Sequence, residues 1–289
     1  MTTEVRWTLG SSLRFRRSVK SIMVYILVVL TCIITFFPLY WMVVTAMMYS
    51  DSIFRYPPIF FPPRLSLQSF IEIMQTYPLA RWFSNTLFVA AASTFFALLI
   101  SVFGAYSLSR FRFKGRLVAI TSILITQMVP PPLFVIPLYV LFRDLMLLDT
   151  FTGLIIGHTT FTLPLCIWVL KGFFDSVPIE LEEAAMLDGC SRIGALFRII
   201  LPLSLPGLAA TTVLAMVTSW NEFALAVTLM NTKSKWMLSV GLTSFIGEYQ
   251  IPWNQVAAGA IVMVLPIVLA FAYLQKYLIS GLSAGAIKG

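Results

Sequence analysis

The chain has 289 residues, of which 59% are hydrophobic and only 11% charged, and its mean hydropathy is +0.90. A soluble domain is about 45–50% apolar and about 25% charged, so this composition excludes a soluble globular protein and indicates an integral membrane protein. The formal charge of +8 is not gathered into a basic run with interleaved aromatics. No nucleic acid partner is therefore expected, and the preference of Lys and Arg for cytosolic loops accounts for the charge.

Six apolar segments follow a basic start. Residues 1–20 are expected to form a cytosolic N-terminal tail, and residues 21–289 a transmembrane domain. A helix needs roughly 20 apolar residues to cross the hydrocarbon core. The first segment is too long for the core of a signal peptide. The predicted spans are about Ile22–Met48, Trp82–Leu108, Leu117–Phe142, Phe151–Leu170, Leu203–Met230 and Val256–Tyr273. The fold class is thus an all-α integral membrane protein.

The third segment is the exception, because three consecutive prolines, Pro130 to Pro132, stand at its centre. Proline removes a backbone donor and breaks or kinks a helix. This segment is therefore either a span or a broken, re-entrant helix.

The charges between the spans predict the orientation. With a cytosolic N-terminus, an even number of spans returns the C-terminus to the cytosol, and the inner segments then hold 14 of the 20 Lys and Arg. This bias favours both termini in the cytosol. Of the three cysteines, Cys32 and Cys166 lie in apolar segments and Cys190 in a predicted cytosolic loop, so neither a disulfide nor a metal site is expected.

The longest predicted outer loop, Asp51 to Arg81, contains Pro57-Pro58 and Pro62-Pro63 among aromatic residues. Proline fixes φ and removes donors, so an extended ordered segment is expected here rather than a sheet. Two interpretations stay open: a docking surface for an external partner, or a lid over helix ends.

The predicted inner loop between the fourth and fifth spans differs in character, because it holds five of the twelve acidic residues. Pro178, three glutamates, Ala184-Ala185 and Asp188-Gly189 predict a short helix with acids at its positive end and a glycine stop. Ser191 is placed to cap a second short helix that runs toward Pro202. The two helices predict either a compact docking element or an ordinary connector.

Within the spans, ionisable residues are scarce. Glu222 lies in the fifth segment beside Trp220 and Asn221, and an ionisable residue at that depth is a functional candidate by default. These three residues suit a sugar, but they are equally suited to hydrogen bonds between helices. The only histidine, His158, has no acid near it in the sequence, so we predict a packing or hydrogen-bonding role for it.

The acidic loop also carries a specific spacing. Glu183-Ala184-Ala185 is followed after three residues by Gly189, and after nine more by Ile199, Leu201 and Pro202. This resembles the signature loop of permease subunits in ABC importers that depend on a solute-binding protein. The segments 131–139, 220–223 and 281–289 are similar to those of the carbohydrate branch, and specifically to the second permease of the maltose and glycerol-phosphate systems.

The resemblance implies a type I importer permease with alternating access, in the cytoplasmic membrane of a bacterium or archaeon. It implies four kinds of partner besides the lipid bilayer: a second permease as heterodimer, two cytosolic ATPases that bind MgATP, an external solute-binding protein, and a sugar, oligosaccharide or polyol. The loop at about 176–201 would be the coupling helix. Glu183 would anchor it to the ATPase, Ala184 and Ala185 would allow close approach, Asp188 would belong to the same contact, and Gly189 would form the turn.

Other function classes are weighed against this one. The chain contains no Gly-x-x-x-x-Gly-Lys-Ser/Thr motif, so no ATPase site, cofactor or enzymatic activity is expected in it. A permease for amino acids or peptides would share the loop but not the Trp220 tetrad. A secondary transporter should show paired intramembrane charges or internal repeats, and an intramembrane enzyme should show a catalytic constellation within the spans.

Overall fold

The computed structural model describes residues 4–247 and 250–286, and every element in these ranges is a helix. Backbone contacts divide the chain into two compact units. Unit 1 comprises residues up to 72 together with 252–261, and unit 2 comprises 73–251 together with 262 onward. Two helices, α2 (Gln68–Thr76) and α13 (Trp253–Ala286), contribute residues to both units.

Unit 1 is built from α1 (Glu4–Ala46), the start of α2 and the start of α13. The helix α1 begins well before the apolar segment, so the basic residues of the predicted tail continue the same helix. Asn254 ties the unit together, because its side-chain amide donates to Ser50 Oγ and to Ser69 Oγ, each at 3.0 Å. Gln255 likewise donates to Glu72 at 3.0 Å.

The predicted extended segment at 51–81 is only partly extended, because α2 occupies its second half.

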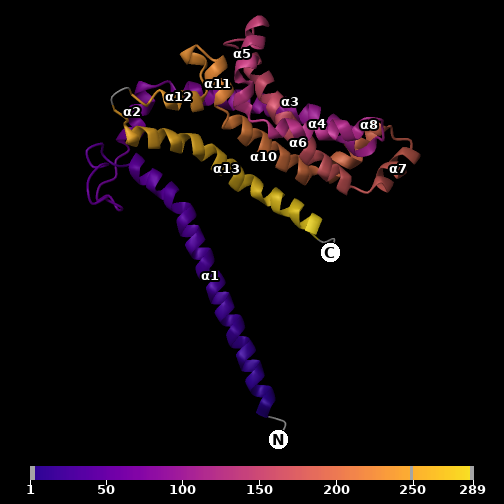
Figure 1. Ribbon diagram of the computed structural model, residues 1–289, viewed down its shortest axis with the longest axis horizontal. Coiled ribbons are helices and arrows are strands. Elements are labelled where there is room, and N and C mark those ends of the chain that lie inside the picture. The colour runs from indigo at the N-terminus through magenta and orange to yellow at the C-terminus, as the bar shows by residue number, and fades with distance from the viewer. Residues whose placement is uncertain (1–3, 248–249, 287–289) are drawn as a thin grey trace. The chain divides into compact units, whose positions relative to one another are not determined.

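Unit 2 is a helical bundle. Its long helices are α3 (Leu79–Arg110), α6 (Phe151–Ser176) and α10 (Leu205–Trp220), which lie side by side (Figure 1). A second group of helices, α4 (Arg116–Met128), the 3₁₀ turn η1 (Pro131–Phe134) and α5 (Val135–Asp144), forms the broken third segment. Of the two alternatives left open for this segment, the structure shows the broken helix, since α4 ends at Met128 and the two halves are bent by 92°.

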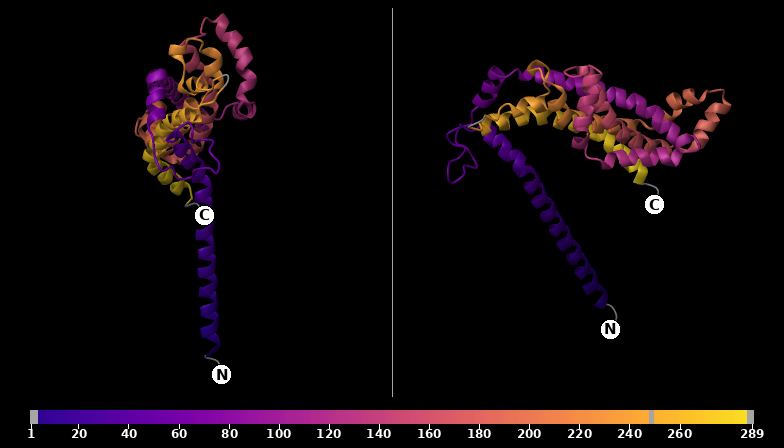
Figure 2. Two further views of the ribbon diagram at one scale, coloured as in Figure 1. Left: turned by 90° about the vertical axis from the view of Figure 1, so that its left-hand side faces the viewer. Right: turned by 45° about the horizontal axis from the view of Figure 1, so that its top comes forward.

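Short helices lie at both ends of this bundle (Figures 1 and 2). One end carries α7 (Ile179–Leu187), α8 (Arg192–Ala195), the π-helical turn η2 (Leu196–Ile200) and α9 (Leu201–Leu203). The other end carries α11 (Ala224–Leu229), the 3₁₀ turn η3 (Lys233–Lys235) and α12 (Leu238–Thr243). Each end has its own apolar cluster, around Leu196 and Ile200 at the first and around Leu225 and Leu229 at the second.

Close packing of α6 and α10 depends on a glycine. A methyl group placed at Gly207 would come within 2.2 Å of Phe173 Cγ and 2.7 Å of Phe173 Cβ. Small residues of this kind let membrane helices approach closely.

The connection between α5 and α6 is held to the segment after α11 by one carboxylate. Asp149 accepts hydrogen bonds from the backbone nitrogens of Asn231 and Thr232, at 3.0 and 2.9 Å. It also accepts from the Thr232 hydroxyl at 2.6 Å and pairs with Lys235 at 3.0 Å. This contact fixes the loops at the α11 end of unit 2.

Four helices of the described residues are long and apolar enough to cross a membrane: Lys20–Ala46, Leu79–Arg110, Phe151–Ser176 and Trp253–Ala272. Two bent pairs raise the number to six if each pair is one span, namely the broken third segment and Arg192–Leu203 with Leu205–Trp220, which are bent by 81°. The predicted continuous fifth span, Leu203–Met230, is wrong in its second half. The helix α10 ends at Trp220, and α11 begins only at Ala224.

Candidate functional site

The acidic loop folds into a compact element of short helices, which we call the knob (α7 to α9, residues 179–203). Pro178 precedes α7, and Glu180 and Glu182 occupy its first turn, where carboxylates are favoured by the helix dipole. Gly189 ends the helix with φ of +88°, a left-handed conformation that only glycine adopts without strain. Ser191 Oγ then accepts from the Gly194 nitrogen at 3.1 Å and caps α8. Both predicted helices and the turn are confirmed.

The predicted docking residues divide between an exposed and a buried side. Glu183, Ala184, Asp188 and Gly189 are exposed, whereas Ala185 is half-buried against the rest of the knob. The side chain of Leu187, between them, is 88% exposed. The exposed predicted residues, together with Leu187, therefore form a surface with two carboxylates, two small residues and one projecting apolar side chain.

In the second half of the signature, Leu201 packs against the apolar cluster that includes Leu196 and Ile200, while Ile199 is half-buried and Pro202 is exposed. Leu201 thus belongs to the attachment of the knob to α3 and α6. The signature thus contains both the exposed residues of the knob and a residue that attaches the knob to the bundle.

A buried carboxylate that the sequence analysis did not single out lies beneath this surface. Glu182 is only 3% exposed and pairs with Arg110, whose Nε donates to Glu182 Oε2 at 2.8 Å. Tyr106 donates its hydroxyl to the other carboxylate oxygen. Arg110 also donates through Nη2 to the Val177 carbonyl oxygen at 2.8 Å. We call Tyr106, Arg110 and Glu182 the clasp.

The break between α10 and α11 holds the second candidate site. Glu222 Oε1 accepts from the Leu225 nitrogen at 2.8 Å, and Oε2 accepts from the Ala226 nitrogen at 3.1 Å. These are backbone donors at the start of α11, which have no partner inside the helix. Ser239 in α12 donates to the Glu222 carbonyl oxygen at 2.9 Å. The Glu222 carboxylate therefore caps α11, while the Glu222 carbonyl oxygen binds Ser239 of α12.

The structure bears out the hydrogen-bonding role predicted for His158, and it also shows that this histidine has an acid close to it in space. Its Nε2 lies 3.2 Å from Glu222 Oε2, and its Nδ1 lies 2.7 Å from Ser219 Oγ. His158 is 2% exposed, and the Glu222 side chain is 18% exposed. Sixty-four positions separate the two residues in the chain, and only the packing of α6 against α10 brings them together.

The other two predicted pathway residues differ from each other. Trp220 is 2% exposed, and its indole nitrogen donates to the Met263 carbonyl oxygen at 3.1 Å. Asn221 is exposed, and its side-chain amide donates to the Val217 carbonyl oxygen of its own helix at 3.0 Å. Of the three residues, Asn221 is thus the most open to a solute, and Trp220 is part of the core.

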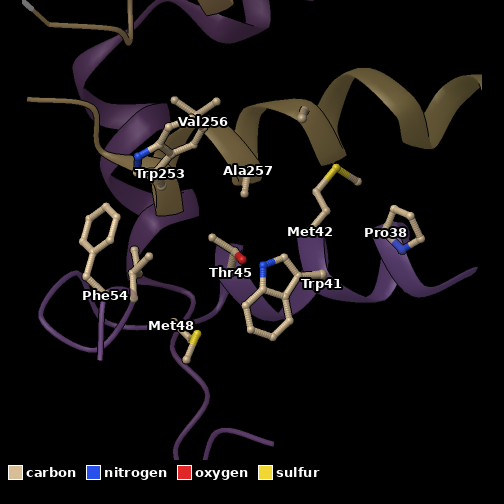
Figure 3. Close-up of a pocket in the computed structure, with 11 residues that line it drawn as sticks. Pro38, Trp41, Met42, Thr45, Met48, Phe54, Trp253, Val256 and Ala257 are labelled. Carbon is tan, nitrogen blue, oxygen red and sulfur yellow. The ribbon is translucent and has the colours of Figure 1, made fainter. Parts of the chain in front are cut away.

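Unit 1 contains an apolar pocket of about 510 Å³ between α1 and the start of α13 (Figure 3). Trp41, Phe54 and Trp253 supply its aromatic walls, and Thr45 supplies its one hydroxyl side chain. A sugar-binding site needs several polar groups that converge on the ligand. This lining does not provide them, so the pocket is a poor match for a carbohydrate. Among the described residues, no group of three His, Cys, Asp or Glu side chains could hold a metal ion.

Comparison with known proteins places these features in a family. Residues 94–284 match the family described as binding-protein-dependent transport system inner membrane component. The chain is 35% identical over 253 residues to the sulfoquinovosyl glycerol transport system permease protein SmoH of Agrobacterium fabrum, covering 88% of this chain and 89% of that protein. It is 36% identical over 253 residues to the diacetylchitobiose uptake system permease protein DasC of Streptomyces coelicolor, covering 88% and 92%.

Two further similarities extend over nearly the whole chain. The trehalose/maltose transport system permease protein MalG of Thermococcus litoralis is 33% identical over 273 residues, covering 93% of this chain and 98% of that protein. A chain in the crystal structure of a bacterial ABC transporter that imports the acidic polysaccharide alginate superposes with a TM-score of 0.78. It is 23% identical and covers 90% of this chain and 96% of that chain. At this identity, the superposition establishes a common fold.

Proposed function

Because the chain belongs to the family of binding-protein-dependent transport system inner membrane components, we propose that it is a permease subunit of an ATP-driven importer for a sugar, oligosaccharide or polyol. The carbohydrate class is supported by relatives named for a sulfoquinovosyl glycerol, a diacetylchitobiose and a trehalose/maltose system. The chain spans most of each relative, so the proposal concerns the whole subunit.

The topology we propose has six spans, with both termini in the cytosol, and the broken third segment and α10 each contribute one crossing. The distribution of Lys and Arg supports this orientation. In this arrangement the knob lies on the cytosolic side of a bacterial or archaeal cytoplasmic membrane. The helix break around Glu222 lies toward the opposite side.

The partners we propose are a second permease, two cytosolic ATPases and an external solute-binding protein. MgATP would bind to the ATPases and not to this chain. The observation that carries the proposal is the surface of the knob: an exposed Glu183 and Ala184 beside a Leu187 that is 88% exposed. This surface offers a partner protein both charged groups and apolar contact area.

For solute contact, we propose Asn221 and the exposed edge of Glu222. They lie at an interruption of a membrane helix, where irregular backbone is tolerated if it is buried in protein or lines a water-filled cavity. In this proposal Trp220 does not contact the solute. Its side chain is buried and holds α10 to α13 through a hydrogen bond to Met263.

The alternative class of secondary transporter gains one observation. Its expected mark is a pair of intramembrane ionisable groups, and His158 with Glu222 is such a pair. We nevertheless prefer the ATP-driven importer for two reasons. The Glu222 carboxylate is accounted for by its structural role as the cap of α11. The relatives are named as permease proteins of transport systems. A permease for amino acids or peptides is the other alternative within the same family.

The experiment that tests the proposal is isolation of the complex through a tagged copy of this chain. The parent protein is expected to carry an ATPase with it, and Glu183→Arg to lose that ATPase, because placing like charges opposite each other across an interface weakens it strongly. Asp144→Arg is the matched control, since it reverses the charge of an acidic residue that is 61% exposed at the end of α5, away from the knob. Retention of the ATPase at full stoichiometry by the Glu183 variant would contradict the docking role.

A further inference from the structure

The one fully buried side chain of α7 contacts a long helix of the bundle through polar interactions. Of the nine residues of α7, only Glu182 is buried, and it is buried by Tyr106 and Arg110 of α3. The helix α7 also contacts α8 and η2, but those belong to the knob itself. Isolated helices of this length are marginal in water, so their position depends on tertiary contacts. The clasp is therefore the main contact between α7 and a long helix of the bundle.

The other half of the knob is attached differently. Leu196 and Ile200 of η2 are fully buried in a cluster with Val102, Leu170 and Phe174 of α3 and α6. Apolar contacts of this kind have no preferred direction, whereas a carboxylate with two separate donors fixes both position and orientation. Arg110 and Glu182 also stand at the ends of their helices that favour their charges, the last turn of α3 and the first turn of α7.

Adjacent glutamates on α7 thus have different surroundings. Glu183 is exposed, whereas Glu182 has a side chain only 4% exposed against an Arg110 side chain only 7% exposed. The connections of α7 to the chain are short, with Val177 and Pro178 before it and the left-handed Gly189 after it. A force applied to the exposed side of α7 reaches α3 through the clasp more directly than through these connections.

We propose that Tyr106, Arg110 and Glu182 are positioning residues that make α7 and the end of α3 one rigid body, so that movement of an ATPase is passed to the bundle at α3. This inference rests on the proposed docking of the knob. Because all three side chains of the clasp are buried, none of them touches the ATPase in this arrangement. Loss of the clasp should therefore loosen the transmission without removing the contact that Glu183 makes.

The test measures rigidity in the assembled complex, with MgATP and vanadate as the probe. Spin labels are placed on cysteines introduced at Leu181 in α7, outside the proposed docking residues, and at Leu99 in α3, each 46% exposed, in a background without the three native cysteines. For the parent clasp we expect one narrow distance distribution that is the same with and without nucleotide. For Tyr106→Phe and Glu182→Gln we expect distributions at least about twofold broader, since α7 then samples local openings.

Three comparisons make the result specific. Ser109→Ala is the matched control, because it removes an exposed hydrogen bond of 2.6 Å to Asp175 at the same end of α3 and should leave the distribution narrow. The exchange Arg110→Glu with Glu182→Arg restores opposite charges and should narrow the distribution again. Tyr106→Phe keeps the buried ring, so it decides the question if Glu182→Gln does not assemble.

Two outcomes would overturn the inference. Distributions as narrow in the Tyr106 and Glu182 variants as in the parent would show that the clasp is not needed for rigidity. Loss of the ATPase from these same variants would show that the clasp only shapes the docking surface. The docking role itself fails by a separate result, retention of the ATPase by Glu183→Arg, so the two failures are distinguishable.

Discussion

The carboxylate of Glu222 accepts three hydrogen bonds, and removing it tests what the helix break does. Glu222→Ala leaves α11 without its cap and His158 without its partner. Loss of an N-cap costs about 0.5–2 kcal/mol, and a buried polar group left unpaired costs about 1–3 kcal/mol. The expected loss in the free energy of unfolding is on the order of 3 kcal/mol. Side-chain hydrogen bonds between membrane helices average only about 0.6 kcal/mol, so we expect the loss to be about 3 kcal/mol or less.

Glu222→Gln is the sharper variant, because it keeps one accepting oxygen and the shape of the side chain. One of the three hydrogen bonds has to be lost or reversed, so we expect a loss of about 1 kcal/mol. The complex should still assemble, while transport falls. Asn221→Ala is the matched control for stability, since that side chain is exposed and bonds only within α10, and it should cost less than about 0.5 kcal/mol.

Two assays separate structure from solute contact. Thermal unfolding of the purified permease reports the stability change, and uptake of the sugar that stabilises the cognate binding protein reports transport. Equal unfolding midpoints for Glu222→Ala and Asn221→Ala would refute the capping argument. Unchanged uptake by Glu222→Gln at limiting sugar would remove Glu222 from the solute pathway, whatever its structural role.

Two further predictions concern packing and pH. Gly207→Ala should destabilise the protein by about 1–3 kcal/mol, because the new methyl group meets Phe173. In Gly172→Ala the new methyl group meets nothing within 4 Å, so this variant should stabilise α6 by about 0.5–1 kcal/mol. Equal unfolding temperatures for the two variants would contradict this prediction. Burial raises the pKa of Asp149, but hydrogen bonds from Thr232 and an adjacent lysine outweigh it and lower the pKa from 3.8 to about 2. The carboxylate therefore stabilises the fold above pH 3.8 and loses this effect as the pH falls toward 2, so the stability difference between the parent and Asp149→Asn should shrink over that interval. A difference that stays constant with pH, measured by denaturant unfolding, would show that the charge of Asp149 is not responsible.

Features that depend on local chemistry could be predicted from the sequence. Long apolar runs identify membrane helices because the hydrocarbon core excludes unsatisfied backbone groups. The prolines at 130–132 indicated a broken helix as one of two alternatives for the third segment, and Gly189 and Ser191 predicted the turn and the cap within the knob. Each of these signals acts within a few residues of the chain. The spacing from Glu183 to Pro202 was likewise enough to indicate the family.

Which acidic residue faces which partner was decided only by the tertiary structure. The sequence places Glu182 and Glu183 side by side with equal charge, but the packing of α7 against α3 buries one and exposes the other. Four basic residues lie between 110 and 116, and no local pattern shows that Arg110 is the one that reaches Glu182. The pairing of His158 with Glu222 is of the same kind, because it joins residues 64 positions apart. Local residue properties determined where helices begin and end, whereas the partners of buried charges depended on how helices distant in the chain pack together.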